Sequence, residues 1–180
     1  MDTFKYDIAI SFAEEDRNAA LAMALALEMQ NFQKVYYYPD NREATAGLSL
    51  DSTLTAIYSR QARYAIVLLS ATYAQKKYTQ IELAAMLQRV KDAQDQVYLI
   101  PVLLDAPGTH DFPELNNLGY IPWDYEPKRV ALTMKKLFGY QLPGNNPDKQ
   151  RQYIQLTTQK IVNQQATYNQ TNTNSSTTYL

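Results

Sequence analysis

The stretch YAIVLL, residues 64–69, is a continuous apolar run near the middle of the chain. A strand inside a parallel sheet is covered by helices on both faces, so its sequence is apolar throughout and does not alternate between apolar and polar residues. The run is too short for a buried helix and has the length of a strand. It therefore predicts an inner strand of a parallel sheet.

Strands and helices are predicted to alternate on both sides of this run. The other strands are expected at residues 6–11, 34–38, 97–104 and 119–123, and the helices at about residues 14–32, 51–60, 79–93 and 126–138. Such alternation is typical of an α/β protein. The predicted fold class is a three-layer, flavodoxin-like fold, with a parallel five-stranded sheet and helices on both faces.

Three local features carry more specific expectations. Residues 19–27 are apolar all round, which predicts a helix that is buried against the sheet. Pro101 has no N–H to donate inside the strand 97–104, and this implies an edge strand or a bulge. Trp123 is expected in the core.

The carboxyl ends of the strands are the expected place for a binding site, because ligands of open parallel sheets sit outside those ends. Residues 11–14, 39–47 and 70–73 follow three of the predicted strands. These three segments form the predicted rim of the site.

Composition excludes several classes of function. The chain has a formal net charge of -1, no cysteine and one histidine, His110. Proteins that bind nucleic acid through phosphate contacts are usually more basic, and a metal site or a Ser-His-Asp relay is hard to assemble from one histidine. The sequence has no secretory signal pattern and no run of membrane-spanning length. We therefore expect a cytoplasmic domain that binds no metal, nucleic acid or membrane.

The composition changes after Tyr140, so we divide the chain into three parts. Residues 1–140 form the main domain, residues 141–168 an extension that is expected to be helical, and residues 169–180 a tail. Asn146 and Pro147 suit the start of the extension's helix. The tail is mostly Asn, Thr and Ser, a composition typical of flexible segments.

Two segments resemble the TIR domains of bacteria. The first is YDIAISFAEEDR at residues 6–17, a strand that ends in Ser-Phe-Ala and is followed by acids. The second begins with YYYPDNREATAGL at residue 36 and ends with IELAAML at residue 87. The resemblance covers about residues 6–138. It implies an enzyme that cleaves the nicotinamide–ribose bond of NAD⁺ to give ADP-ribose or a cyclic isomer, often in defence against phage. It also implies self-association, with an upstream sensor or a downstream effector as possible partners.

The resemblance implies a set of site residues as well. Glu82 takes the place of the essential glutamate, and Tyr78 stands four residues earlier, where the family usually has tryptophan. The other implied residues are Phe12 and Ala13 at the nicotinamide and ribose, Asp40, Arg42 and Gly47 on a loop that gates the site and joins subunits, and Ser70 and Tyr73 at the ribose or phosphate. Phe12 equally fits an ordinary core aromatic, Arg42 a solvated loop, and Ser70 a helix cap.

Glu82 has two interpretations. Thr79 and Glu82 have the spacing of a capping box, in which the two side chains satisfy free N–H groups at a helix start. Glu82 also shares a helix face with Tyr78 and Met86, which places it among apolar neighbours. A partly desolvated carboxylate in a cleft is where catalytic function is often found. With the resemblance added, catalysis is the favoured interpretation.

Three functions remain open from the sequence. The first is NAD⁺ cleavage, in which NAD⁺ is a substrate and no cofactor is needed, because the chain has no Gly-rich dinucleotide loop. The second is a non-catalytic module that binds other TIR domains. The third is an enzyme like the nucleoside deoxyribosyltransferases, which would also use a carboxylate on an α/β fold.

Overall fold

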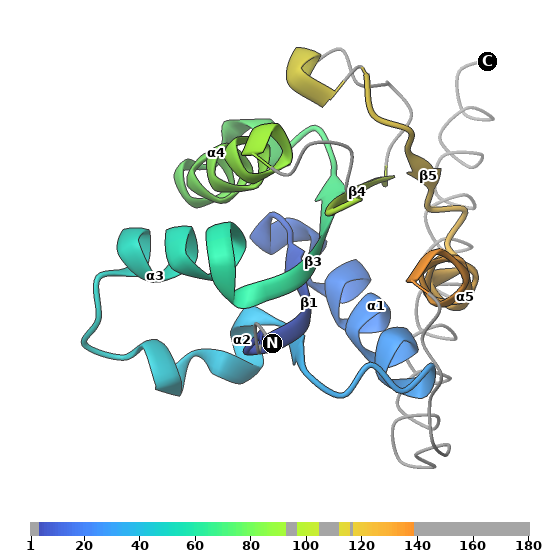
Figure 1. Ribbon diagram of the computed structural model, residues 1–180, viewed down its shortest axis with the longest axis horizontal. Helices are drawn as coiled ribbons and strands as arrows, with labels where there is room; N and C mark the ends of the chain where they lie inside the picture. Colours follow the sequence, from blue (N-terminus) through green and yellow to red (C-terminus); the bar gives the residue numbers. More distant parts are fainter. Residues whose placement is uncertain (1–3, 93–96, 105–111, 116, 139–180) are drawn as a thin grey trace, which may run out of the picture.

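The computed structural model describes residues 4–92, 97–104, 112–115 and 117–138. Within these residues, parallel strands form one five-stranded sheet in the order β2-β1-β3-β4-β5 (Figure 1). The strands are β1 (Tyr6–Ser11), β2 (Val35–Tyr36), β3 (Ala62–Leu69), β4 (Leu99–Leu103) and β5 (Ile121–Pro122). The parallel sheet and the inner position of β3 are confirmed.

Helices cover both faces of this sheet. One face carries α1 (Arg17–Met29) and α5 (Pro127–Phe138), and the other carries α3 (Leu50–Ala56) and α4 (Lys77–Asp92) (Figure 1). The predicted three-layer fold class is therefore confirmed. Shorter turns of helix connect the layers: α2 (Tyr38–Asn41), η1 (Glu14–Asp16), η2 (Glu43–Thr45), the π-helical turn η3 (Ile57–Gln61), η4 (Tyr73–Gln75) and η6 (Pro113–Leu115).

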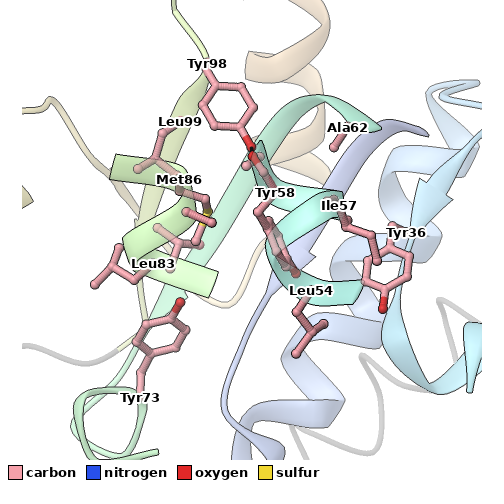
Figure 2. Packing of buried hydrophobic residues seen from close by; sticks show 14 of the residues in the cluster. Tyr36, Leu54, Ile57, Tyr58, Ala62, Tyr73, Leu83, Met86, Tyr98 and Leu99 are labelled. Carbon is pink, nitrogen blue, oxygen red and sulfur yellow. Dashed lines mark hydrogen bonds between the residues drawn. The ribbon is translucent and has the colours of Figure 1, made fainter. Parts of the chain in front are cut away.

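The inner strands are apolar because each of their faces is buried. In β3, Ile66 and Leu68 belong to the core under α1 and α5, while Ala65, Val67 and Leu69 belong to the core under α3 and α4 (Figure 2 shows part of the latter core). This explains the unbroken run at residues 64–69, since successive side chains of a strand point to opposite faces.

The helix expected to be buried is α1, and all but one of its residues 19–27 have less than a tenth of their surface exposed. Trp123 is also in the core, as predicted. Among the helices of the described ranges, none is both long enough and apolar enough to cross a bilayer.

The second strand is shorter than predicted. Residues 34–38 were expected as a strand, but β2 is only Val35–Tyr36, and the chain turns into α2 at Tyr38. Pro39 stands in the first turn of this helix, where its fixed φ fits and its missing N–H is not needed. The polar segment that follows, expected as a loop, contains the rest of α2 and then η2.

The prediction that Pro101 marks an edge strand is wrong, because β4 pairs with β3 on one side and with β5 on the other. The Leu103 carbonyl accepts a hydrogen bond from the Trp123 N–H. Backbone groups alternate between the two neighbours of a strand, so Pro101 also turns its nitrogen toward β5. The pairing with β5 starts one residue later, at Val102, and Pro101 therefore interrupts no ladder bond.

Three predictions fall outside the described residues. They concern His110 in the segment after β4, the helical extension at residues 141–168 and the tail at residues 169–180.

Candidate active site

A cleft of about 190 Å³ opens between the carboxyl end of β1, the segment after β2 and the first turns of α4. Its position is that expected for an open parallel sheet, outside the carboxyl ends of the strands. Its walls are mostly apolar or aromatic, with a few ionisable groups. The lining residues are Ile10, Phe12, Ala13, Glu14, Tyr38, Leu50, Leu54, Lys76, Tyr78, Thr79 and Glu82.

The carboxylate of Glu82 lies at the base of this cleft. Only 8% of the residue is exposed, and its Oε2 accepts a hydrogen bond of 2.5 Å from the Ser11 hydroxyl. Ser11 is the last residue of β1 and is fully buried. Because the side chains of β1 alternate, Ser11 follows Ala9 toward α4, while Ile8 and Ile10 face the other layer.

Burial makes the ionised form of Glu82 unfavourable. Desolvation raises the pKa of Glu82 from 4.5 to about 8, and the hydrogen bond from Ser11 offsets this only in part. A carboxyl group that ionises near pH 4.5 in the unfolded chain and near pH 8 in the folded one lowers stability at neutral pH. At pH 7 the cost is about 3 kcal/mol. Such a cost is typical of groups kept for function.

The capping-box interpretation of Glu82 is wrong. The helix α4 begins at Lys77, so Thr79 is already inside its first turn. The Thr79 hydroxyl donates to the carbonyls of Tyr73 and Lys76, at 2.5 and 2.8 Å, and does not cap an N–H group. The Glu82 side chain accepts from Ser11 instead of from the backbone at the start of its own helix.

Aromatic side chains line the cleft around the carboxylate. Phe12 is partly buried and stacks on Tyr37, with ring centroids 5.5 Å apart, so it is both a packing residue and a wall of the cleft. Tyr78 is 44% exposed at the mouth, and Met86 is fully buried one turn beyond Glu82. The predicted helix face of Tyr78, Glu82 and Met86 is therefore present.

Of the other predicted site residues, Ala13 lines the cleft but Asp40, Arg42, Gly47, Ser70 and Tyr73 do not. Asp40, Arg42 and Gly47 are exposed on the segment beyond Tyr38. Arg42 touches the site only indirectly, since its guanidinium lies 5.7 Å from the centre of the Tyr38 ring. Gly47 has a φ of 78°, which a glycine adopts without strain.

Ser70 and Tyr73 have structural roles behind the cleft. The Ser70 hydroxyl donates to Asp16 at 2.5 Å and accepts from the N–H of Tyr73, the first residue of η4, at 3.3 Å, although the N-cap position of that turn is Thr72 and not Ser70. Tyr73 is fully buried. Its hydroxyl lies 2.5 Å from that of Ser11, which makes it a neighbour of the Glu82 partner and not a wall of the cleft.

Several site residues were missed by sequence reasoning. Ser11 was placed on the rim but given no role, and the two side chains Tyr38 and Lys76 were not singled out at all. Tyr38 and Lys76 could have been found from position alone, since Tyr38 is the last residue of a predicted strand and Lys76 lies shortly before a predicted helix. Ser11 could not, because its partner is 71 residues away.

Charged groups surround the mouth of the cleft. Lys76 pairs with Glu15, and Glu14 pairs with Arg17. The Lys76 ammonium lowers the pKa of the Glu15 carboxyl. Within the described residues, no three His, Cys, Asp or Glu side chains lie close enough to hold a metal ion. The cleft thus offers a desolvated carboxylate, aromatic walls and one ammonium group at its rim.

Comparison with known proteins gives a family model and several relatives. The model described as "TIR domain" matches residues 8–138. A protein of Aquimarina amphilecti, named 3′ cyclic ADP-D-ribose synthase AaTIR, is 30% identical over 122 residues, which are 66% of this chain and 35% of that protein. The present chain therefore spans about a third of the length of this curated relative.

Two solved structures share the fold. The TIR domain of the Toll-related receptor TRR-2 from Hydra magnipapillata is 21% identical with a TM-score of 0.58, and the match covers 74% of this chain and 96% of that one. A metazoan TIR-STING receptor from C. gigas is 20% identical with a TM-score of 0.58, over 72% of this chain and 39% of that one. At these identities the likeness concerns the fold alone.

The burial of Glu82 predicts an unusual dependence of stability on pH. Below about pH 4.5 the carboxyl group is protonated in the folded and unfolded chains alike; as the pH rises toward 8, the wild type should lose stability relative to Glu82→Gln. Denaturant titrations from about pH 5 to about pH 9 would measure the difference, which should reach a few kcal/mol. The exposed Glu43→Gln serves as the control. Parallel curves for wild type and Glu82→Gln would show that Glu82 ionises normally.

Proposed function

Because the chain belongs to the TIR domain family, we propose that its cleft cleaves the bond between nicotinamide and ribose in NAD⁺, with Glu82 as the catalytic carboxylate. The observation that carries this proposal is the position of Glu82, a desolvated carboxylate at the base of an aromatic cleft. The similarity to a protein named as a cyclic ADP-ribose synthase supports the same substrate.

The reaction requires one negative charge near the ribose and no general acid. Nicotinamide leaves a cationic glycoside as a neutral molecule, so its departure requires no proton. Positive charge then develops on the ribose, as in the oxocarbenium-like transition state of glycosidases. A carboxylate fixed next to that charge stabilises it, and the stabilisation is stronger in a site with little water.

Attack on the ribosyl cation completes the reaction in either of two ways. Water adds its oxygen to the anomeric carbon and releases a proton, which gives ADP-ribose. A nucleophile within the same substrate gives a cyclic ADP-ribose isomer and likewise releases a proton. The ionised Glu82 can accept this proton. The expected products are therefore nicotinamide with ADP-ribose or with a cyclic isomer.

Aromatic rings explain how the cleft binds the nicotinamide end. A pyridinium ring is attracted to the face of an aromatic side chain by cation–π interaction and by stacking. Tyr78 is the exposed aromatic residue of the cleft, one helical turn before Glu82, and Phe12 and Tyr38 lie on other walls. Tyr78 thus provides a ring where the family usually has tryptophan.

The cleft is small for a whole dinucleotide, since ligand pockets usually measure about 300–1,000 Å³. The adenosine half of NAD⁺ therefore extends beyond the residues that line it. Self-association, which the family resemblance implies, would supply further surface from a second copy. A role in defence against phage, with a sensor or an effector as partner, belongs to the same proposal.

Glu82→Gln separates catalysis from the other two functions. The variant keeps the side chain's size but removes the charge that faces the ribosyl cation, so turnover of NAD⁺ should fall by a factor of about 100 or more while NAD⁺ binding persists. Chromatography of reactions with NAD⁺ or with deoxynucleosides measures the products. Turnover of deoxynucleosides alone would favour a deoxyribosyltransferase, and no turnover by the wild type would favour an interaction module.

The wild-type rate should also depend on pH in a defined direction. Only ionised Glu82 is active, and its pKa is raised to about 8, so kcat/KM should rise with pH and level off above that value. Glu43→Gln, which changes an exposed carboxylate, should behave as the wild type does. If Glu82→Gln cleaves NAD⁺ at the wild-type rate, the catalytic role of Glu82 is wrong.

Lys76 is the basic side chain on the lining of the cleft, and it can exchange Glu15 for the diphosphate of NAD⁺. Lys76→Ala should raise KM about fivefold and leave kcat nearly unchanged, because an exposed charge pair contributes about 1 kcal/mol. The effect should shrink as salt is added. Lys91→Ala removes the same charge at the far end of α4 and should leave KM unaltered. Equal values of KM for the two variants would contradict the role of Lys76.

A further inference from the structure

Four polar groups form a line that leads away from the cleft into the core. They are the Glu82 carboxylate, the hydroxyls of Ser11 and Tyr73, and the backbone carbonyl of Thr79. The Ser11 hydroxyl lies 2.5 Å from Glu82 and 2.5 Å from the Tyr73 hydroxyl, which in turn lies 3.3 Å from the Thr79 carbonyl. Figure 2 shows Tyr73 with its hydroxyl directed toward the part of α4 that carries Leu83 and Met86.

Counting hydrogens gives this line a direction. Ser11 has one hydrogen and two partners, so when it donates to ionised Glu82 it must accept from Tyr73. When Glu82 is protonated, the acid donates to Ser11, the Ser11 hydrogen turns to Tyr73, and the Tyr73 hydrogen turns to the Thr79 carbonyl. Every hydrogen has an acceptor in both arrangements, as buried polar groups require.

We propose that Ser11 is a positioning residue for Glu82, and that Tyr73 completes a hydrogen-bond chain whose direction reverses when the carboxylate takes up a proton. The importance of the chain for catalysis rests on the function proposed above. Its existence does not, because hydrogen-bond direction and the ionisation of Glu82 are properties of the protein without substrate.

Rigid elements hold each member of the chain. Ser11 ends β1, where it is paired in register with Val67 of β3, and both Ser11 and Tyr73 are fully buried. The Thr79 hydroxyl donates to the Tyr73 carbonyl at 2.5 Å, which fixes the turn η4 against the start of α4. The carboxylate of Glu82 is therefore held in place before any substrate arrives, the arrangement that electrostatic catalysis needs.

Within the described ranges, the other buried ionisable groups around Glu82 do not donate a hydrogen bond to its carboxylate. Tyr58, from η3, donates to the carbonyl of Ile10 at 2.9 Å, and the hydroxyl of Tyr36, from β2, has no hydrogen-bond partner among the described residues. Both tyrosines are close enough to Glu82 for its charge to raise their pKa values further, although burial is the larger cause.

At the mouth of the cleft, the charges are already engaged. Glu14 pairs with Arg17 and Lys76 with Glu15, and Tyr38 and Tyr78 lie on the wall as further titratable groups. Among the described residues, Ser11 is thus the side chain that donates a hydrogen bond to Glu82.

Two substitutions should move the pKa of Glu82 in opposite directions. Ser11→Ala removes the bond to the ionised carboxylate and should raise the pKa above its wild-type value. Tyr73→Phe keeps the ring, but when Glu82 is protonated the hydroxyls of Glu82 and Ser11 then have two hydrogens and only the one hydrogen bond between them, so one hydrogen is left without an acceptor in the chain. The protonated form is then disfavoured, so the pKa should fall.

Unfolding experiments can measure this pKa without any substrate. Denaturant titrations across pH 5 to 9 would be run on the wild type, Ser11→Ala and Tyr73→Phe, each with and without Glu82→Gln. The difference within each pair isolates the titration of Glu82. The pH at which this difference levels off marks the titration midpoint of Glu82 in the folded chain. We expect that midpoint to be more alkaline in Ser11→Ala and more acidic in Tyr73→Phe than in the wild type.

A merely structural role for these residues would change stability equally at every pH and leave the midpoint in place. The proposed hydrogen-bond chain would be contradicted if the titration midpoint of Glu82 stayed unchanged, moved in only one of the two variants, or moved in the same direction in both. With NAD⁺ as substrate, Ser11→Ala should lower kcat at neutral pH about tenfold for each unit by which the pKa rises, with KM little affected. If the two variants shift the titration midpoint of Glu82 in opposite directions but Ser11→Ala leaves kcat unchanged, the hydrogen-bond chain stands and the proposed function is contradicted.

Discussion

The hydrogen bond from Ser11 to Glu82 joins the two halves of the site. Ser11 is the last residue of β1, and Glu82 lies one turn inside the helix α4. The bond therefore fixes the carboxylate against the carboxyl end of β1. Among the described residues, Ser11 is the side chain whose hydrogen bond favours the ionised form of Glu82. A buried carboxylate that loses this donor would stay protonated to a still higher pH, so an even smaller fraction of the protein would carry the charge at neutral pH.

The fold makes this bond possible at a cost to its own stability. The layer between the sheet and the helices α3 and α4 is otherwise apolar, and it contains three buried tyrosines, Tyr36, Tyr58 and Tyr73, around the carboxylate. Their bulk keeps water away, which raises the pKa of Glu82 and strengthens any electrostatic interaction inside the cleft. The same desolvation that makes the folded protein less stable at neutral pH makes the ionised carboxylate more effective toward a cation.

Local sequence patterns predicted much of the fold and the main site residue, but not the contacts between distant segments. The run at residues 64–69 and the alternation of elements gave the correct layers, and the spacing of Tyr78, Glu82 and Met86 gave the correct helix face. The capping box failed because α4 already begins at Lys77, so Thr79 lies inside the helix and its hydroxyl donates to the carbonyls of Tyr73 and Lys76. The partnership of Ser11 and Glu82 depends on how β1 packs against α4, which no local pattern contains. The loop residues Asp40, Arg42 and Gly47 were assigned by resemblance, and in the single chain they lie away from the cleft.

The most direct measurement is the ionisation of the Glu82 carboxyl observed by ¹³C NMR, with the resonance assigned by its absence from Glu82→Gln. It would be followed across pH in the free protein and with 1-methylnicotinamide, a small pyridinium cation, or with neutral nicotinamide as the matched control. The expected midpoint is about 8 in the free protein, and it should become more acidic with the cation only, because a positive charge in the cleft favours the ionised carboxylate. A midpoint near the ordinary value of 4.5, or one that does not respond to the cation, would contradict the view that a desolvated carboxylate stabilises positive charge in this cleft.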